Sequence, residues 1–322
     1  MLRRLLYSGL IFVLPLQLSA QAPVKELSKT AEKLEKKFLK NDIYVKIPAG
    51  TLTKNIEAGE TELVEIDNYF MLNREVTNID YREFLHYYKE RDTAKYSAYM
   101  PDSTVWRTKN TYMEPMVNLY SNHPAYYNYP VVGVTYNQAK AYCAWLTEII
   151  NNNTDKIFKK VLYRLPTEDE WIYAANGGKD NSIFPWESDF LTTADGDFKA
   201  NCITFSPENI YRDTLFQKNE FGAFEEVYIY RTHPGGFNGV RGVLNDASDL
   251  TAPSKSYYPN GFGLYNMAGN VAEMVAEPGI THGGSWKDPG YYLQNSISQY
   301  YTDVNKGANN IGFRYIMEVI EY

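Results

Sequence analysis

Sequence rich in Gly, Asn, Pro and Tyr fills much of this 322-residue chain and limits what it can fold into. Backbone polar groups in long loops cannot all pair within helices or sheets, so ordered loops of this kind need an additional stabilising element, such as a disulfide or a bound ion. The chain has only two cysteines, Cys143 and Cys202. Cys143 lies in an apolar helical pattern that favours a free buried thiol over a single bridge to Cys202. Bound cations are the obvious substitute, which directs attention to clusters of oxygen-bearing side chains.

Short regular segments interrupt the irregular sequence. The apolar periodicity of an amphipathic helix occurs in four segments: 24–40, 77–90, 137–150 and 167–175. The last segment opens with Thr167 and Glu170 at capping-box spacing. Alternation over 43–50 predicts a strand. Because residues 41–322 contain neither an internal repeat nor a clear linker, we expect a single domain there.

The N-terminus has the three-part layout of a secretory signal peptide. A basic start is followed by the apolar run 5–18 and by small residues before a cleavage point after Ala20. This run is short and broken by proline, which is unfavourable for a membrane span. We expect residues 1–20 to be a signal peptide and residues 21–40 to form an N-terminal amphipathic helix. The mature protein is then exported, and periplasmic or associated with the outer membrane. There is no cysteine near the cleavage point, so a lipid anchor is not expected.

Charge excludes one class of partner. The chain carries 32 basic and 39 acidic side chains, a formal net charge of −7. Proteins that bind nucleic acids gain most of their affinity by neutralising phosphates with basic side chains. We therefore expect no nucleic-acid partner.

Several motifs resemble one family in the right order. They are 130–145, 163–178, 260–274, His282–Trp286 and Gly312–Arg314. Together they are similar to the formylglycine-generating enzyme, or sulfatase-modifying factor, superfamily over roughly residues 45–320. The resemblance implies an irregular α+β fold, related to C-type lectin domains, low in regular secondary structure and commonly holding calcium.

The resemblance also implies two structural calcium sites. In the first, Asn201 and Asp246 would give side-chain oxygens, and Cys202 and Ser248 would give backbone carbonyls. In the second, Asn266 and Glu273 would give side-chain oxygens, and Gly269 and Val271 would give carbonyls. Calcium takes six to eight hard oxygen ligands, which these residue types supply. The alternative is that Asn266 and Glu273 only cap turns in a glycine-rich loop.

The family's chemistry is not expected in this chain. Members that oxidise a substrate cysteine hold copper through two cysteines, and the matching positions here are Asp288 and Leu293. Neither residue is a soft ligand for copper(I). A sister branch binds iron through three histidines, but this chain has only four, which are widely separated: His86, His123, His233 and His282. We therefore expect no copper, no iron and no oxidase activity.

A narrower likeness covers an insertion at 100–107, 115–120 and 123–130. It resembles the gliding-motility proteins GldK and GldJ, with the PorK group, which are catalytically silent members that build the periplasmic ring of the type IX secretion system. Those relatives are typically longer lipoproteins, whereas this chain lacks the N-terminal cysteine.

Three functional hypotheses follow from these observations. The leading one is a non-catalytic assembly protein of a secretion or gliding machinery, whose loops 96–129 and 205–240 contact envelope proteins, outer-membrane components among them. The second is a glycan- or peptide-binding module, which exposed Trp106 or Trp186 beside a groove would favour. The third is an oxidase-type enzyme, which converging histidines and carboxylates near Asp288 would favour.

Overall fold

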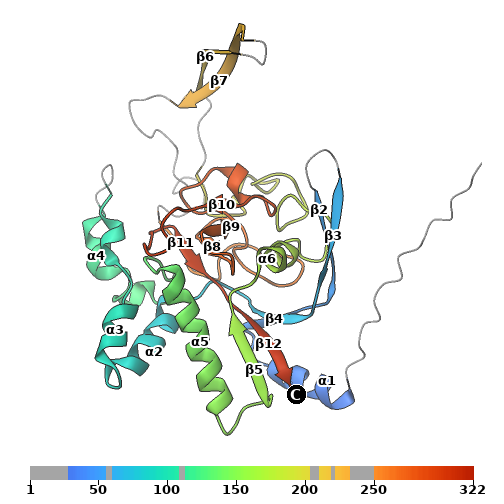
Figure 1. Cartoon of the computed structure of the whole chain (residues 1–322), viewed down its shortest axis with the longest axis vertical. Helices are drawn as coiled ribbons and strands as arrows, with labels where there is room; N and C mark the ends of the chain where they lie inside the picture. The colour runs from blue at the N-terminus through green and yellow to red at the C-terminus, as the bar shows by residue number, and fades with distance from the viewer. Residues whose placement is uncertain (1–27, 56–59, 109–112, 204–209, 219–221, 233–249) are drawn as a thin grey trace, which may run out of the picture.

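The computed structural model describes residues 28–55, 60–108, 113–203, 210–218, 222–232 and 250–322 (Figure 1). The predicted signal peptide, residues 1–20, lies outside these ranges.

The first sheet joins the two ends of the described chain. Its four strands lie in the order β1 (Tyr44–Ile47), β4 (Tyr69–Leu72), β12 (Ile316–Glu321) and β5 (Lys160–Arg164). All three pairings are antiparallel. All four residues of β4 are buried, as expected for a central strand whose two faces are both covered. The strand predicted at 43–50 corresponds to β1.

The second sheet is small, and its two middle strands are largely buried. Its strands lie in the order β10 (Gln299–Tyr300), β9 (Ile280–His282), β8 (Ala272–Met274) and β11 (Ile311–Phe313). Every residue of β8 is buried, and β8 pairs in parallel with β11. A separate hairpin of β2 (Gly50–Asn55) and β3 (Thr61–Ile66) flanks the body.

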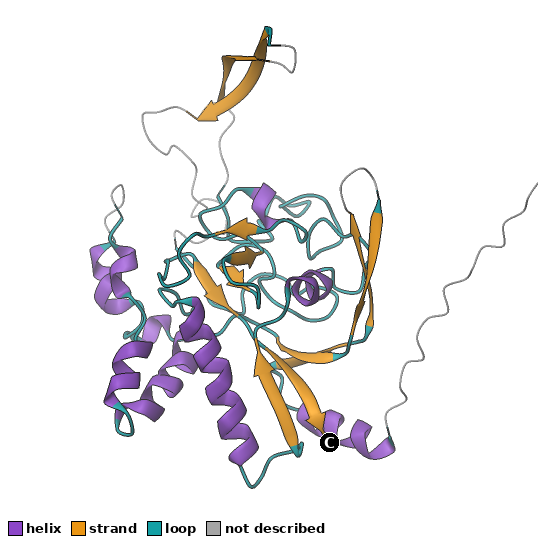
Figure 2. Cartoon of the chain, viewed as in Figure 1, coloured by secondary structure: helices purple, strands orange, loops and turns teal. Residues whose placement is uncertain are grey.

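The four predicted helices are present as α1 (Lys29–Phe38), α2 (Asn78–Lys89), α5 (Tyr136–Asn152) and α6 (Glu168–Ala175). Capping boxes begin the last three of them, at Thr77, Thr135 and Thr167. Figure 2 shows most of the helical segments gathered on one side of the sheets. Among the helices of the described ranges, none is long and apolar enough to cross a bilayer.

The described parts of the segment 96–129 contain several short helices, which corrects the expectation of a long loop. It contains the end of α3 (Thr93–Tyr99), then α4 (Glu114–Leu119) and two short 3₁₀ turns, η2 (Ser103–Trp106) and η3 (Pro124–Tyr126). Local side-chain caps explain these short elements. The side chain of Asp92 accepts a hydrogen bond from the Lys95 amide, and Asp102 accepts one from the Thr104 amide.

The segment 205–240 contains a long β-hairpin where a loop was expected. Strands β6 (Ile210–Lys218) and β7 (Phe224–Thr232) pair antiparallel over nine residue pairs. Figure 1 draws this hairpin apart from the body. The mixed content of 28% helix and 24% strand confirms the predicted α+β class.

Candidate functional site

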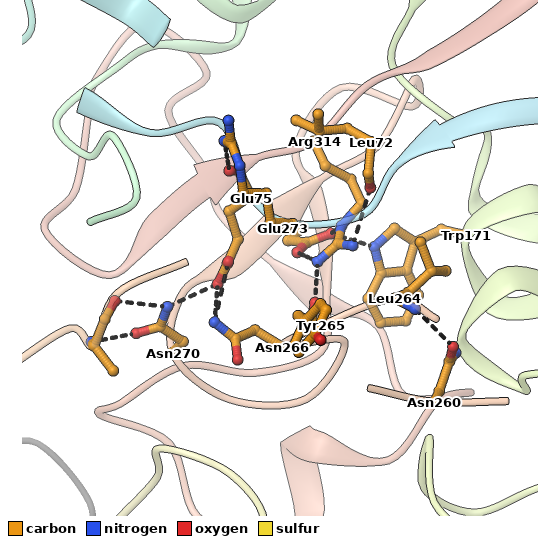
Figure 3. A network of polar contacts seen from close by, with 12 residues as sticks. Leu72, Glu75, Trp171, Asn260, Leu264, Tyr265, Asn266, Asn270, Glu273 and Arg314 are labelled. Carbon is orange, nitrogen blue, oxygen red and sulfur yellow. Dashed lines mark hydrogen bonds and ion pairs between the residues drawn. The ribbon is translucent and has the colours of Figure 1, made fainter. Parts of the chain in front are cut away.

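The loop 266–271 contains three predicted ligands of the second calcium site, Asn266, Gly269 and Val271, and Figure 3 shows Asn266 and Asn270 of this loop. Asn266, Gly269 and Asn270 have positive φ angles of 52°, 75° and 64°, a conformation that Gly and Asn tolerate best. A Cβ on Gly269 would lie 2.4 Å from the backbone oxygen of Asn201. The same oxygen accepts a hydrogen bond from the Asn270 amide at 2.8 Å. The glycine therefore lets the Asn201 segment pack directly on the loop.

A buried carboxylate that the sequence analysis missed, Glu75, faces this loop (Figure 3). It is fully buried and accepts hydrogen bonds from Nδ2 of Asn270 at 2.7 Å and from Nδ2 of Asn266 at 3.1 Å. Burial raises the pKa of Glu75 to about 8, although the nearby Arg314 guanidinium acts to lower it. The available sequence signal was weak: a single acidic residue directly before the buried Val76.

A second buried carboxylate, Glu273, is paired with Arg314. The guanidinium donates to both carboxylate oxygens, from Nε at 2.6 Å and from Nη2 at 2.5 Å. The Trp171 indole donates to Glu273 at 2.7 Å, and Arg314 also donates to the Tyr265 carbonyl at 2.8 Å. Both charged side chains are almost completely buried. The charge of Glu273 is therefore balanced within the protein by a bidentate ion pair.

The predicted calcium ligands fit a hard cation only in part. The amide oxygens of Asn201 and Asn266 are buried and have no hydrogen-bond partner among the described residues. Such oxygens are ligands that calcium accepts. Glu273, in contrast, already uses both carboxylate oxygens in contacts with Arg314 and Trp171. The fit therefore rests on neutral oxygens, with Glu75 as an additional carboxylate beside them.

Of the other predicted calcium ligands, some lie in the described structure and some do not. Gly269 and Val271 belong to the same loop, and Val271 is buried. Cys202 follows Asn201 directly, and burial raises the pKa of its thiol to about 12. Asp246 and Ser248 lie outside the described residues. The first predicted site is thus described only on its Asn201 side.

The two positions that correspond to copper-binding cysteines have structural contacts. Ser285 Oγ donates a hydrogen bond to the Asp288 carboxylate, and the Asp288 carbonyl accepts one from the Ile203 amide at 3.0 Å. Leu293 is fully buried. Its Cδ1 lies only 2.8 Å from where a Cβ on Gly284 would be. Asp288 therefore closes a turn and Leu293 fills the core beneath the Gly-Gly-Ser motif.

Both cysteines are free and buried, which confirms the prediction of a free buried thiol at Cys143. They belong to different apolar clusters: Cys143 packs with α2 and α5 residues, and Cys202 packs with Leu293. Burial raises the pKa of the Cys143 thiol well above its ordinary value. Neither side chain is a ready thiolate, because low pKa and exposure are what make a cysteine reactive.

His282 is held in the core by an acidic partner. Its Nε2 lies 3.0 Å from Glu168 Oε1, and its ring stacks on Trp171 with centroids 5.1 Å apart. Hydrogen bonding to His282 lowers the pKa of Glu168 to about 2. Ser298 Oγ also donates to Glu168, at 2.5 Å. Fixed in this way, the imidazole supports packing between α6 and β9.

No cluster typical of a metal-dependent oxidase is found in the described part of the chain, where no three His, Cys, Asp or Glu side chains are grouped to hold a metal ion. His86 is exposed on α2. His123 accepts a hydrogen bond from the Ala125 amide at 3.2 Å, and His233 lies outside the described residues. The described histidines therefore do not converge near Asp288.

The tryptophans named for a glycan-binding role do not form an exposed platform. Trp106 is 1% exposed and packs on Tyr120 with ring centroids 4.6 Å apart. The exposed Trp106 that would favour a glycan- or peptide-binding module is therefore not found. Trp186 is half-buried and donates to the Phe190 carbonyl at 2.9 Å. The Lys199 ammonium covers its ring at 5.7 Å.

Comparison with known proteins identifies the family to which this architecture is similar. The model of the sulfatase-modifying factor enzyme 1-like domain family matches residues 28–319. The formylglycine-generating enzyme of Thermomonospora curvata is 33% identical over 150 residues, which cover 47% of this chain and 34% of the relative. The inactive C-alpha-formylglycine-generating enzyme 2 of Bos taurus is 27% identical over 272 residues, which cover 74% of this chain and 73% of the relative. The match spans about a third of the length of formylglycine-generating enzymes such as the first.

Solved structures agree on the fold. PvdO from Pseudomonas aeruginosa superposes with a TM-score of 0.50 and 19% identity, covering 85% of this chain and 94% of that chain. Treponema denticola variable protein 1 gives a TM-score of 0.51 and 17% identity with the same two coverages. At this level of identity the likeness concerns the fold alone.

Proposed function

This chain belongs to the sulfatase-modifying factor enzyme 1-like domain family, and on that premise we propose that it is a non-catalytic member that acts as an assembly protein of the cell envelope through protein–protein contacts. The observation that carries the proposal is that Asp288 and Leu293 make structural contacts at the two positions predicted for copper-binding cysteines. At the positions where oxidising members hold two thiolates, one side chain accepts a hydrogen bond from Ser285 and the other fills the core. Neither can bind copper(I) as a soft ligand. The inactive relative, which matches most of this chain, supports the same conclusion.

The hairpin β6–β7 supplies a contact surface for this role. Phe216, Phe224 and Tyr228 lie on one face of it, with exposed fractions of 66%, 69% and 53%. Aromatic residues are enriched in protein interfaces. Among the described strands, β6 and β7 pair only with each other, and an isolated two-stranded hairpin is marginally stable in water. We therefore assign the hairpin to docking on a protein partner.

The likeness of the 96–129 insertion to GldK, GldJ and PorK supports a more specific assignment. We propose that the partners are envelope proteins of a type IX secretion or gliding machinery, outer-membrane components among them. The expected location is the periplasm or the outer membrane. The described part of the insertion contains short helices, of which α3 contacts α2, and this arrangement is suitable for a fixed contact.

A direct assay tests the loss of catalysis. The purified protein, loaded with copper(I) and supplied with dioxygen, is incubated with a peptide that carries one cysteine in a sulfatase-type sequence. Mass spectrometry should find no conversion of the cysteine to formylglycine, whereas a formylglycine-generating enzyme run in parallel converts it. Turnover by this chain would contradict the proposal.

Affinity capture from the native envelope tests the assembly role. The tagged protein should recover secretion or motility components that the double variant Phe216→Ser/Phe224→Ser does not recover. Leu63→Ser serves as the control, because Leu63 is also exposed (62%) but lies on the other hairpin, β2–β3. Equal recovery by the wild type and the double variant would rule out the β6–β7 hairpin as the contact.

We also propose that calcium stabilises the fold near loop 266–271. Asn201 would contribute its unpartnered amide oxygen to the first predicted site, and Asn266 would contribute its own to the second, where the Glu75 carboxylate is hydrogen-bonded to Asn266. Calcium that binds only the folded state raises its stability by mass action. Calcium should therefore raise the melting temperature of the chelator-treated protein, and magnesium at equal concentration should not. Identical melting curves with and without calcium would contradict both sites.

A further inference from the structure

A cavity of about 200 Å³ lies between α2, the end of α3 and the turn that follows α4. It is separate from loop 266–271 and from the β6–β7 hairpin. Its walls include the apolar side chains of Leu85, Met100 and Val131. The helical insertion 96–129 forms one side, so this cavity exists because the insertion folds against α2.

One residue that lines the cavity, Asn78, has a hydrogen-bond acceptor that is unpartnered within the described part of the chain. This residue is only 2% exposed. Its Nδ2 donates to the carbonyls of Tyr120 and Tyr126, at 3.1 and 2.9 Å. Its Oδ1 is buried and has no partner among the described residues. Because burying a polar atom without a partner costs about 1–3 kcal/mol, this oxygen favours a ligand that brings an N–H donor.

The rest of the cavity is bordered by a row of basic side chains. Arg82, His86 and Lys89 follow Asn78 along one face of α2 and all line the cavity. Arg82 is fixed by a hydrogen bond to the Ser121 carbonyl at 3.2 Å. His86 and Lys89 are exposed. No aspartate or glutamate is among the lining residues that the structure describes. The cavity is therefore locally basic in a chain whose net charge is −7.

The total length of this row matches a short extended chain, although the individual spacings are shorter than its side-chain repeat. A helix rises about 1.5 Å per residue, so Arg82 and His86 are about 6 Å apart along the axis and His86 and Lys89 about 4.5 Å. In an extended peptide, every second side chain lies on the same side, at a repeat of about 6.6 Å. From Asn78 to Lys89 the row runs about 16 Å, the length of roughly five extended residues.

From these features we propose that the basic row along α2, with the cavity beside it, binds a short extended acidic peptide segment of a partner protein, one side chain of which enters the cavity. A backbone N–H of the peptide donates to Asn78 Oδ1. Carboxylates at alternate positions meet Arg82, His86 and Lys89, and an intervening apolar group packs on Leu85 and Met100. Peptide binding can be tested on the purified chain alone. Its outcome is therefore independent of the assembly role proposed above.

The test is a titration of the purified protein with a fluorescently labelled five-residue peptide that has glutamate at positions one, three and five. The matched peptide with lysine at these positions should not bind. His86→Glu/Lys89→Glu should weaken binding by at least about tenfold, because it reverses the charge of Lys89 and replaces the His86 imidazole with a carboxylate that repels the ligand. Both residues are exposed, so the variant should fold, which its melting curve verifies.

The control variant is Lys33→Glu, which makes the same Lys-to-Glu charge reversal as Lys89→Glu at an exposed position on the remote helix α1. It should bind the peptide as the wild type does. Equal weakening by Lys33→Glu would show that only overall charge matters and would overturn the proposal. Absence of binding at millimolar peptide would also overturn it. A competition experiment with inorganic phosphate and with acetate completes the test. If either anion displaces the peptide with an affinity equal to that of the peptide, the site binds small anions and the peptide assignment is wrong.

Discussion

At the scale of single residues, burial decides what each charged side chain near loop 266–271 can do. Arg314 and Glu273 are removed from water and bound to each other, so neither is available to a solvent-borne ligand. Glu75 has amide partners and, among the described residues, no such direct cation, and burial raises its pKa. Two buried carboxylates of the same core therefore have different partners, an arginine for Glu273 and two asparagine amides for Glu75.

Replacing Arg314 by methionine should destabilise the protein strongly. The substitution leaves Glu273 as a buried charge without its partner, which typically costs about 3–5 kcal/mol. The double variant Arg314→Met/Glu273→Leu removes both charges and should regain much of this loss. Urea unfolding curves of the two variants check the prediction. A single variant as stable as the double variant would show that the ion pair does not act in this way.

The pair of Glu168 and His282 predicts a pH dependence. The pKa of Glu168 in the folded protein is about 2, below its ordinary value of 4.5, mainly because of the hydrogen bond with His282. The unfolded chain therefore binds more protons between these values, and stability rises with pH across them. The stabilisation is fully present above pH 4.5 and is lost as the pH falls toward about 2.

Glu168→Gln tests this dependence. The variant should be less stable than the wild type above pH 4.5, by on the order of 2 kcal/mol for this partly exposed carboxylate. The difference should shrink as the pH falls from 4.5 toward 2. Thermal unfolding at several pH values measures it, and Glu62→Gln, an exposed carboxylate on β3, gives the baseline. A constant difference at all pH values would contradict the titration of Glu168.

At the scale of elements, local capping explains why helices begin where they do. The Thr167 side chain accepts a hydrogen bond from the Glu170 amide, and the Glu170 carboxylate accepts one from the Thr167 amide at 2.7 Å. The Glu170 carboxylate also binds Arg164 of β5. The cap therefore fixes α6 to the end of a strand in the first sheet.

Thr167→Ala should reduce the free energy of unfolding by about 1 kcal/mol, the usual cost of removing an N-cap hydroxyl. Thr93→Ala makes the same chemical change at an exposed first-turn position of α3, whose cap is Asp92. Chemical denaturation of both variants distinguishes the cap from a general effect of losing a threonine. Equal losses in the two variants would contradict the role of the capping box.

The local signals of helices and strands could be predicted from the sequence, whereas the pairings between them could not. The apolar spacing at 137–150 and the capping box at Thr167 depend on neighbours within a few residues, and both are found in the structure. Glu75 and Asn270 form a hydrogen bond although they are 195 positions apart. No periodicity connects such residues, so this part of the candidate site became visible only in three dimensions. The hairpin β6–β7 was missed because its polar and apolar residues are mixed on both faces.

At the scale of the whole molecule, the two ends of the described chain are held together. Strand β1 and the C-terminal strand β12 both pair with β4. The Tyr322 hydroxyl donates to Glu35 of α1 at 2.7 Å, and Lys46 pairs with the same carboxylate at 2.6 Å. Closure of the domain therefore depends on residues near both ends.

The hairpin β6–β7 contributes little to this closed body. Deleting residues 210–232 and joining the flanking segments by a short Gly-Ser linker should leave the melting temperature unchanged within a few degrees, because the described side chains of the hairpin are largely exposed. Differential scanning calorimetry checks this. A large drop in melting temperature would show that the hairpin is part of the fold rather than an added docking element.

Trp171 gives this core its own optical signal. Its indole is fully buried, donates a hydrogen bond to Glu273 and stacks on His282. Indole emission responds to polarity and to nearby quenching groups, so loosening of loop 266–271 or of the Glu273 pair changes the environment of this fluorophore. Emission recorded from a variant that keeps Trp171 as its only tryptophan would therefore follow the state of the buried polar centre in real time, without any added dye.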